Sequence, residues 1–494
     1  MFLIRVILIL PAKLLWWFTV SVWLNICDAM ALPIYAYRKM RDKSTPTHGD
    51  AAFATLKTLR DRGHLKQDGW LIGIVEKKRV YTAAEACVLG AAPRRTGKSL
   101  MASAQLRDLA ERERKADIVV VDPHGDLRRM TEAYFVEKGF QTRTIDFTRP
   151  QASEKYNVTS VMRPLSKFNF DRDIDQFLKL VMPDDKKSSN DHFPAFARIM
   201  MAGATSYMMR TEAGTVTLSQ VVERLTGNIQ QRNEMFSAMR AAGNAVERLA
   251  MNAFEEASSK ERGSFSTTLA RKLNIWLRES FRHITSEGEW TWEDVFLSEA
   301  PTVTYIKAGA GADEGAAARL ILGNAINTRG YMWDDLQNSY TGRGRPKFPR
   351  ELRILVDEAR LIGNCSAIVD AVTQLGKADV TVILWFLAMR DVYDIYPEAS
   401  VITNSCNTIA FGGGTEMSFY EDFSRTLGDR TIENPGYSEG EHGTSQSANE
   451  QARRLMKADE LQRMDRTKLA AILGDLSIFA DKPARPEGDE VRYL

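Results

Sequence analysis

A short loop between an apolar stretch and a helical one constrains this chain more than any other feature. The loop follows the apolar run at 86–89 and precedes a helix-like stretch from 100 to 114. Backbone amides and a helix N-terminus in this arrangement offer positive potential to a polyphosphate. The order of strand, loop and helix therefore predicts an α/β fold with a phosphate-binding (Walker A) loop, formed by Ala92, Pro93, Arg94, Arg95, Thr96, Gly97, Lys98 and Ser99.

Within this loop, Lys98 is placed to reach the β- and γ-phosphates of a nucleotide, and the Ser99 hydroxyl is placed to ligate Mg²⁺. The standard spacing has glycine at the first position, where this chain has Ala92. A bare Gly-Lys-Ser is weak by itself, so the prediction of a nucleotide hydrolase needs a second motif.

The second motif is the segment 352–358, Leu-Arg-Ile-Leu-Val-Asp-Glu, an apolar strand that ends in two carboxylates. Apolar strands ending in acidic residues are common, but together with the loop this one indicates a Walker B motif. Asp357 would hold Mg²⁺ through water, and Glu358 would orient or polarise the attacking water. We therefore predict an ATPase that uses ATP and Mg²⁺, with Lys98, Asp357 and Glu358 as catalytic residues and Ser99 and Asp357 as metal ligands.

The length and charge of the chain leave its partners open. Its 494 residues exceed what one core usually organises, so at least two domains are expected. Lysine and arginine total 66 against 64 acidic residues, a net charge of +2, so any contact with DNA must be local. The four cysteines are scattered without metal-ligand spacing, which predicts a reducing compartment and no zinc site.

The N-terminus differs in kind from the rest. Residues 2–37 are strongly apolar and are followed by a basic cluster, which predicts a membrane anchor at 1–43 with a cytoplasmic exit. The uncharged core at 14–27 is shorter than the about 20 residues needed to span, and one or two helices remain possible. The alternative is a cleaved signal peptide. We expect the bacterial inner membrane, with the bulk of the chain in the cytoplasm.

Strand-like segments at 117–122 and 142–147 alternate with helical patterns, which predicts a parallel, doubly wound sheet. From 171 to about 282 the pattern is helical throughout. We divide the chain into the anchor, a first part of the nucleotide-binding domain, an inserted all-α domain and a second part of the nucleotide-binding domain, at 1–43, 44–157, 158–289 and 290–494. Residues 432–450, rich in glycine, serine and glutamate, suggest a mobile loop.

Two groups of arginines are candidates for contacts with single-stranded DNA, because they combine basic charge with nearby aromatics or lie in a flexible loop. A solvated helix face is the simpler interpretation, and it fits each of these residues. The candidates are Arg262, Arg271 and Arg278 in the helical stretch and Arg343 and Arg345 in the loop before Walker B.

The order of these features resembles the coupling ATPases of conjugation and type IV secretion, the TraG/TraD-like family. The resemblance covers almost the whole chain and also uses His-Gly-x-Ala-x-x-Ala-Thr at 48–55, Asp-Pro-x-Gly-Asp-Leu at 122–127 and Phe-Gly at 411–412. It implies a membrane-anchored homohexamer with RecA-like P-loop nucleotide-binding domains and an all-α domain that recognises relaxase and DNA. The implied function is ATP-driven transfer of single-stranded DNA and relaxase cargo to a type IV secretion channel.

Three positions depart from that family. His124 stands where lysine is usual, Leu387 where a glutamine is usual, and Gly376-Lys377 where members often carry an arginine that serves a neighbouring subunit's nucleotide. Lys377 or Arg390 are the candidate substitutes. These departures motivate an alternative function, a nucleotide-gated docking receptor with little or no pumping. A peptide-translocating ATPase would share every nucleotide motif.

Overall fold

A computed structural model describes residues 48–162, 170–184, 192–309, 311–342, 346–440 and 443–483. The chain forms two compact units. The larger runs from Phe53 to Leu427 and resumes at Met456, and the smaller joins the described residues 48–52 with Gly428–Leu455. The predicted anchor at 1–43 and the candidates Arg343 and Arg345 lie outside the described residues.

An 11-stranded sheet in the order β2-β1-β13-β12-β9-β3-β8-β7-β4-β6-β5 forms the centre of the larger unit. From β9 to β5 every neighbouring pair is parallel. The sequence-predicted parallel sheet is therefore present, made of β3 Cys87–Ala91, β4 Ala116–Val121, β5 Gln141–Asp146, β6 Thr302–Lys307, β7 Glu351–Val356, β8 Val380–Phe386 and β9 Cys406–Ala410.

The remaining four strands extend this sheet with antiparallel pairs, which the sequence analysis did not predict. Part of the reason is the stretch 69–80, in which the strand-like alternation of residues shows no break although the chain reverses direction in a tight turn. Glu76 and Lys77 have φ of 46° and 66°, and this turn makes a hairpin of the stretch. The added strands are β1 Leu71–Val75, β2 Lys78–Tyr81, β12 Lys468–Leu473 and β13 Leu476–Asp481.

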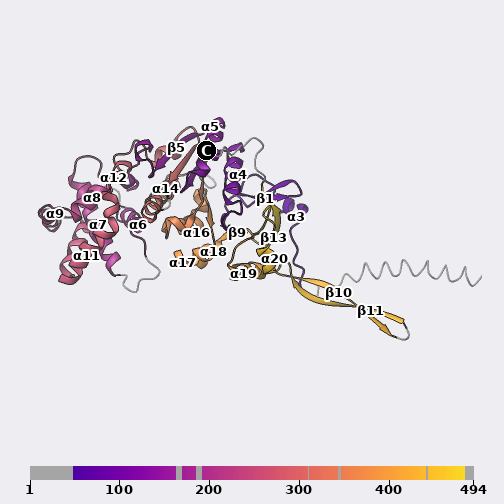
Figure 1. Cartoon of the computed structure of the whole chain (residues 1–494). Helices are drawn as coiled ribbons and strands as arrows, with labels where there is room; N and C mark the ends of the chain where they lie inside the picture. The colour runs from indigo at the N-terminus through magenta and orange to yellow at the C-terminus, as the bar shows by residue number, and fades with distance from the viewer. Residues whose placement is uncertain are drawn as a thin grey trace, which may run out of the picture. The chain divides into compact units, whose positions relative to one another are not determined.

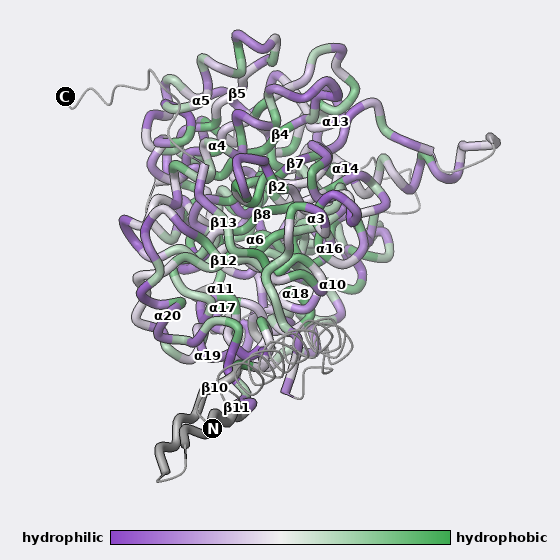
Figure 2. The backbone as a smooth tube through the Cα atoms, turned by 90° about the vertical axis from the view of Figure 1, so that its right-hand side faces the viewer, coloured by the Kyte–Doolittle hydropathy of each residue, from purple (hydrophilic) through white to green (hydrophobic). Residues whose placement is uncertain are grey.

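Both faces of the parallel strands are covered. In β4, Ile118 and Val120 pack with α4 and α5 residues such as Leu106 and Phe135, whereas Val119 and Val121 pack into the opposite core with α14 and α16. Strands buried on both faces need continuous apolar runs, which is why these strands could be predicted from the sequence. Figure 2 shows the hydrophobic stretches gathered around the central strands, β8 among them.

Helices on these two faces, and around the sheet's ends, complete the α/β part of the larger unit. They are α3 Leu56–Asp61, α4 Lys98–Glu111, α5 Asp126–Glu137, α13 Trp292–Leu297, α14 Ala312–Ser339, α15 Ala359–Ile362, α16 Ser366–Thr373, α17 Arg390–Ile395, α18 Ala399–Ser405, α19 Met417–Leu427 and α20 Ala458–Gln462, with 3₁₀ turns η2 Pro150–Ala152, η3 Val158–Val161 and η5 Leu375–Ala378.

A helical domain lies between β5 and β6, and its helices cover the stretch from 171 to about 282 whose sequence pattern is helical. Figure 1 shows α7, α8, α9 and α11 gathered into one bundle. The N-termini of several of these helices are capped by side chains. Thr217 and Ser258 each form a capping box, at α8 and α11, and Asn244 caps α10. The helices are α6 Phe170–Val181, α7 His192–Thr211, α8 Leu218–Thr226, α9 Ile229–Ala242, α10 Ala245–Glu256, α11 Ser259–Leu273, η4 Asn274–Leu277 and α12 Glu279–Ile284.

The smaller unit corrects one expectation. Residues 432–450 are not a loop: β10 Asp429–Gly440 pairs with β11 Gly443–Arg454 as an antiparallel hairpin, and Thr431 donates its amide to the Gly49 carbonyl at 2.9 Å. Backbone pairing forms this hairpin, and such pairing leaves little trace in a polar, glycine-rich composition. No helix within the described ranges combines the length and apolarity needed to cross a membrane.

Candidate nucleotide site

The predicted phosphate loop joins the buried strand β3 directly to α4. Gly97 is the N-cap of α4 with φ 93°, and Arg95 also has a positive φ of 63°. Glycine is needed at 97 because this left-handed conformation disfavours a Cβ. Ala92 is not among the positive-φ residues, and its amide donates to the Phe386 carbonyl at 2.9 Å. The alanine in place of the usual glycine is therefore accommodated without strain.

Contacts behind the loop fix its shape. The Thr96 hydroxyl donates to the Pro93 carbonyl at 2.6 Å. The glycine triplet after β9 packs against the same residues, since a Cβ at Gly414 would lie 3.0 Å from Pro93 Cγ and one at Gly413 3.4 Å from Thr96 Cγ2. The absence of side chains in the triplet thus permits close approach to the phosphate loop.

The fold brings the two predicted motifs together, although β8 lies between β3 and β7 in the sheet. Lys98 Nζ donates to the Asp357 backbone carbonyl at 2.5 Å and lies 3.4 Å from Asp357 Oδ1. The carboxyl ends of parallel strands share one edge of the sheet, so residues directly after β3 and β7 meet there. Lys98 and Asp357 therefore share one site.

Asp357 fits the role of a cation-binding carboxylate. Its side chain is buried, and Oδ1 accepts no well-formed hydrogen bond. Burial raises the pKa of Asp357, the Lys98 ammonium opposes this rise, and Glu358 adds to it. A buried carboxylate oxygen beside one lysine gains from an additional cation. The donor set of Asp357 and the Ser99 hydroxyl is the oxygen chemistry that Mg²⁺ prefers.

Asp122 is a site residue to which the sequence analysis assigned no role. It follows β4, and its carboxylate accepts the amides of Gly125, Asp126 and Arg128 at 2.8–3.1 Å. These bonds cap the start of α5. Burial raises the pKa of Asp122 to about 6, and the nearby Asp357 and Asp126 charges add to this rise. The Asp-Pro-x-Gly-Asp motif is thus a helix cap at the edge of the site.

The structure places the three family departures differently. His124 is at the site, with Nε2 3.6 Å from Glu358 Oε2. Leu387 directly follows β8 and lines a pocket of about 400 Å³ beside Pro93 and Arg94. Lys377, in η5, precedes β8 and so lies at the opposite edge of the sheet from the loop, whereas Arg390 begins α17 after β8, on the loop's side.

The candidate DNA arginines that can be described are not at the nucleotide site. Arg278 pairs with Asp313 of α14 at 2.7 Å, Arg262 lies over the Phe254 ring, and Arg271 is exposed on α11. The structure does not join them into one surface with the phosphate loop. Their role in binding DNA stays a prediction.

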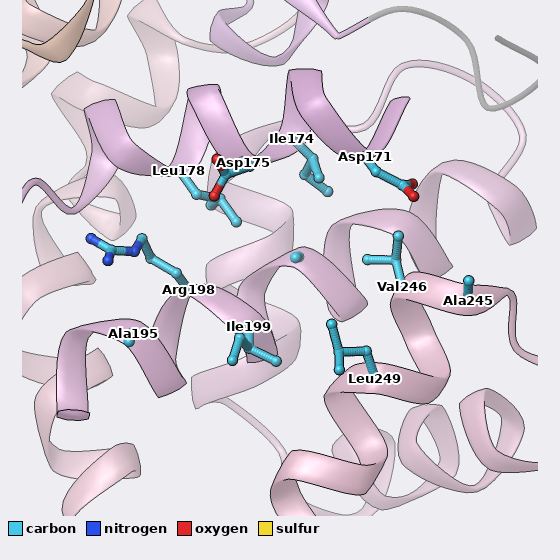
Figure 3. A pocket seen from close by; sticks show the side chains of 11 residues that line it. Asp171, Ile174, Asp175, Leu178, Ala195, Arg198, Ile199, Ala245, Val246 and Leu249 are labelled. Carbon is cyan, nitrogen blue, oxygen red and sulfur yellow. The ribbon is translucent and has the colours of Figure 1, made fainter. Parts of the chain in front are cut away.

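The helical domain contains an apolar groove of about 390 Å³ between α6, α7 and α10. Figure 3 shows Ile174, Ile199, Val246 and Leu249 lining it, with Asp171 and Asp175 on α6. None of its lining residues belongs to the phosphate loop or the Walker B strand. It is therefore a feature of the helical domain alone.

One residue near the loop was missed entirely by the sequence analysis. Lys482 follows β13, in a stretch with no recognisable motif, and its Nζ donates to the Thr96 carbonyl at 2.8 Å. Only the register of the antiparallel strands brings it there. The glycine triplet at 412–414 was the one sequence signal on this side of the loop.

Comparison with known structures supports this fold. The coupling protein TrwB, lacking its first 70 residues and unbound, aligns with a TM-score of 0.63 and 16% identity over 90% of this chain and 96% of that chain. TrwB in complex with the non-hydrolysable ATP analogue ADPNP gives 0.63 and 15% over 88% and 96%. TrwB with ADP and Mg²⁺ gives 0.61 and 14% over 89% and 98%.

At the level of sequence, no curated protein matches this chain. A family match, however, covers most of its length, from residue 53 to residue 476. The matched region contains the phosphate loop, the Walker B strand and the inserted helical domain. The chain therefore belongs to the type IV secretory system conjugative DNA transfer family.

Proposed function

We propose that this protein is an ATP-driven coupling protein of conjugation, which recruits single-stranded DNA with its relaxase and transfers it to a type IV secretion channel. The observation that carries the proposal is the pairing of Lys98 with Asp357 at the carboxyl edge of the sheet. This pairing unites both halves of a nucleotide site in a member of the conjugative DNA transfer family.

ATP and Mg²⁺ fit the residues present. The loop 92–99 would hold the phosphates through its amides, and Ser99 and Asp357 would hold the cation. The bound cation would supply charge neutralisation at the phosphates. The solved complexes of TrwB with ADPNP and with ADP and Mg²⁺ support this assignment.

The residues of the proposed site have distinct parts in hydrolysis. Lys98 places its ammonium against the γ-phosphate, where positioning and electrostatics supply nearly all of the catalysis. Glu358 orients the attacking water and draws on its proton. His124, 3.6 Å from the Glu358 carboxylate, borders the same space.

The remaining features belong to the same proposal. Residues 1–43 anchor the chain in the bacterial inner membrane, and the bulk of it lies in the cytoplasm. A RecA-like site leaves its γ-phosphate near a subunit boundary, so a neighbour completes it and the ring closes as a homohexamer. Single-stranded DNA then passes as cargo, bound locally rather than by the net charge of +2.

The test is ATP turnover by the detergent-solubilised full chain carrying Lys98→Ala. Removing this charge should lower turnover at least about 100-fold. Lys115→Ala is the matched control, because Lys115 lies beyond the other end of α4 and donates to the Ala110 carbonyl. Turnover that survives Lys98→Ala would overturn the proposal.

One observation, the leucine at position 387, favours a second function. The Leu387 side chain, which lines the pocket beside Pro93 and Arg94, has no amide group and so cannot form a side-chain hydrogen bond to the nucleotide. This favours a nucleotide-gated docking receptor with little pumping. Adding single-stranded DNA separates the two: a coupled motor hydrolyses ATP faster, whereas a receptor binds cargo with an unchanged rate.

A further inference from the structure

Lys482 reaches the phosphate loop for a topological reason. β12 is antiparallel to β9 and β13 is antiparallel to β12, so β13 runs parallel to β9 and β3. Its carboxyl end therefore lies at the edge of the sheet where the phosphate loop begins. The residue directly after β13 is Lys482, whose amide donates to the Thr467 carbonyl at 2.7 Å.

The side chain of Lys482 is held between the loop and an aromatic ring. Its Nζ donates to the Thr96 carbonyl at 2.8 Å and lies 3.5 Å from the centre of the Phe411 ring. Ammonium groups are attracted to the face of such a ring. Among the residues that the structure describes, no carboxylate forms an ion pair with Lys482.

The contact with Thr96 fixes the direction of the next amide. In a planar trans peptide, the carbonyl of Thr96 and the N–H of Gly97 point in opposite directions. Holding the carbonyl from behind therefore holds the Gly97 N–H toward the inside of the loop, where amides cradle a phosphate. Gly97 has φ 93°, so its conformation depends on such external constraints.

We propose that Lys482 is a positioning residue of the nucleotide site, which holds the Thr96–Gly97 peptide for phosphate binding and ties the β12–β13 hairpin to the loop. The inference rests on the proposed nucleotide function. Burial lowers the pKa of Lys482 to about 8, with Asp465 opposing this change. Burial disfavours the ammonium form, and the Thr96 carbonyl and the Phe411 ring are the contacts that offset this cost.

The test compares three variants of the full chain by titration with a fluorescent ATP analogue. Lys482→Met keeps the unbranched stem over Phe411 but removes the donor, and should weaken nucleotide binding about 10-fold. Lys482→Arg keeps donors and should recover most of the affinity. Lys468→Met is the matched control, because Lys468 is on the same hairpin and pairs with Asp481 instead of the loop.

Steady-state kinetics and melting separate positioning from a structural role. Lys482→Met should raise KM with little change in kcat, and its melting temperature without nucleotide should not fall. Wild-type affinity in Lys482→Met, or a loss that only follows lower stability, would overturn the inference. If the wild type itself binds no ATP, the proposed function fails; if only Lys98→Ala weakens binding, the role of Lys482 alone is refuted.

Discussion

The carboxyl edge of the sheet and the helical domain are built on opposite principles. At the sheet edge, the loops and residues that follow buried strands converge, so Lys98 lies beside Asp357 and Lys482 lies beside Thr96 although they are far apart in sequence. The helical domain has no such edge, and its most buried charge, Glu247, is neutralised internally by Arg210 at 2.6 Å. Chemistry is thus concentrated where parallel strands end, and the helices supply shape.

One helix connects the two regions. Gly315, Arg319 and Gly323 are four residues apart and share one face of α14. A Cβ at Gly315 would meet the Leu361 carbonyl at 2.2 Å, and one at Gly323 would meet Leu180 at 2.4 Å. Arg319 donates to the Leu180 carbonyl at 2.9 Å and to the Ile362 carbonyl at 2.8 Å. This face joins α6 of the helical domain to α15, which follows Glu358.

The largest expected effect tests whether the two regions are separable. Trp276 is buried in the helical domain and packs edge-on against Phe281. Trp276→Ala should destabilise this domain by about 3–5 kcal/mol through the cavity it leaves. Hydrogen exchange should rise in α7 and α8, while basal ATP turnover stays within about twofold.

Ile229→Ala is the control, because Ile229 is 65% exposed at the start of α9 and should change exchange little. If Trp276→Ala abolished basal turnover as well, the two regions would form one cooperative unit and the comparison would fail.

The next effect isolates the chemistry of the sheet edge. Glu358→Gln should slow hydrolysis about 10²- to 10³-fold, because it removes the group that accepts a proton from water, while ATP binding persists. Single-turnover kinetics and nucleotide titration measure the two separately. Glu132→Gln, at a half-buried residue paired with Arg128 within α5, is the control. Loss of binding in Glu358→Gln would mean that Glu358 supports the structure of the site.

A pH series tests the buried carboxylate of the same edge. The folded pKa of Asp122 is about 6, above its ordinary value of 3.8, so its contribution to stability is full below pH 3.8 and is lost as pH rises through 6. Relative to Asp122→Asn, the wild type should lose up to about 3 kcal/mol between pH 4 and pH 7. Denaturant melts without nucleotide or Mg²⁺ measure this difference, and a constant difference would contradict it.

The smallest expected effect concerns the contacts by which α14 connects α6 to α15. Arg319→Gln removes the guanidinium that bonds Leu180 and Ile362, and should cost about 1–2 kcal/mol of stability. It should also lower kcat several-fold without weakening ATP binding, because α15 follows Glu358. Arg172→Gln breaks an exposed ion pair between α6 and Asp334 and serves as the control. Equal effects of both variants would remove Arg319 as a specific link.

Many helices and strands of the larger unit could be predicted from the sequence. Continuous apolar runs predicted β4 and β7, since strands buried on both faces permit few polar residues. The helix-like stretch at 100–114 is α4, Lys98–Glu111, and the strand-like segment at 142–147 is β5, Gln141–Asp146. The hairpin β10–β11 was wrongly predicted as a loop, because backbone pairing can form in a polar, glycine-rich sequence.

The sequence by itself determined the phosphate loop, the Walker B carboxylates and the place of the inserted helices, since each is a local pattern of residue type and spacing. Only the tertiary structure decided which distant residues join them. Lys98 meets Asp357 across an intervening strand, and Lys482 reaches Thr96 because two antiparallel steps return β13 to the direction of β3. Strand order and direction are properties of long-range pairing, and no local pattern encodes them.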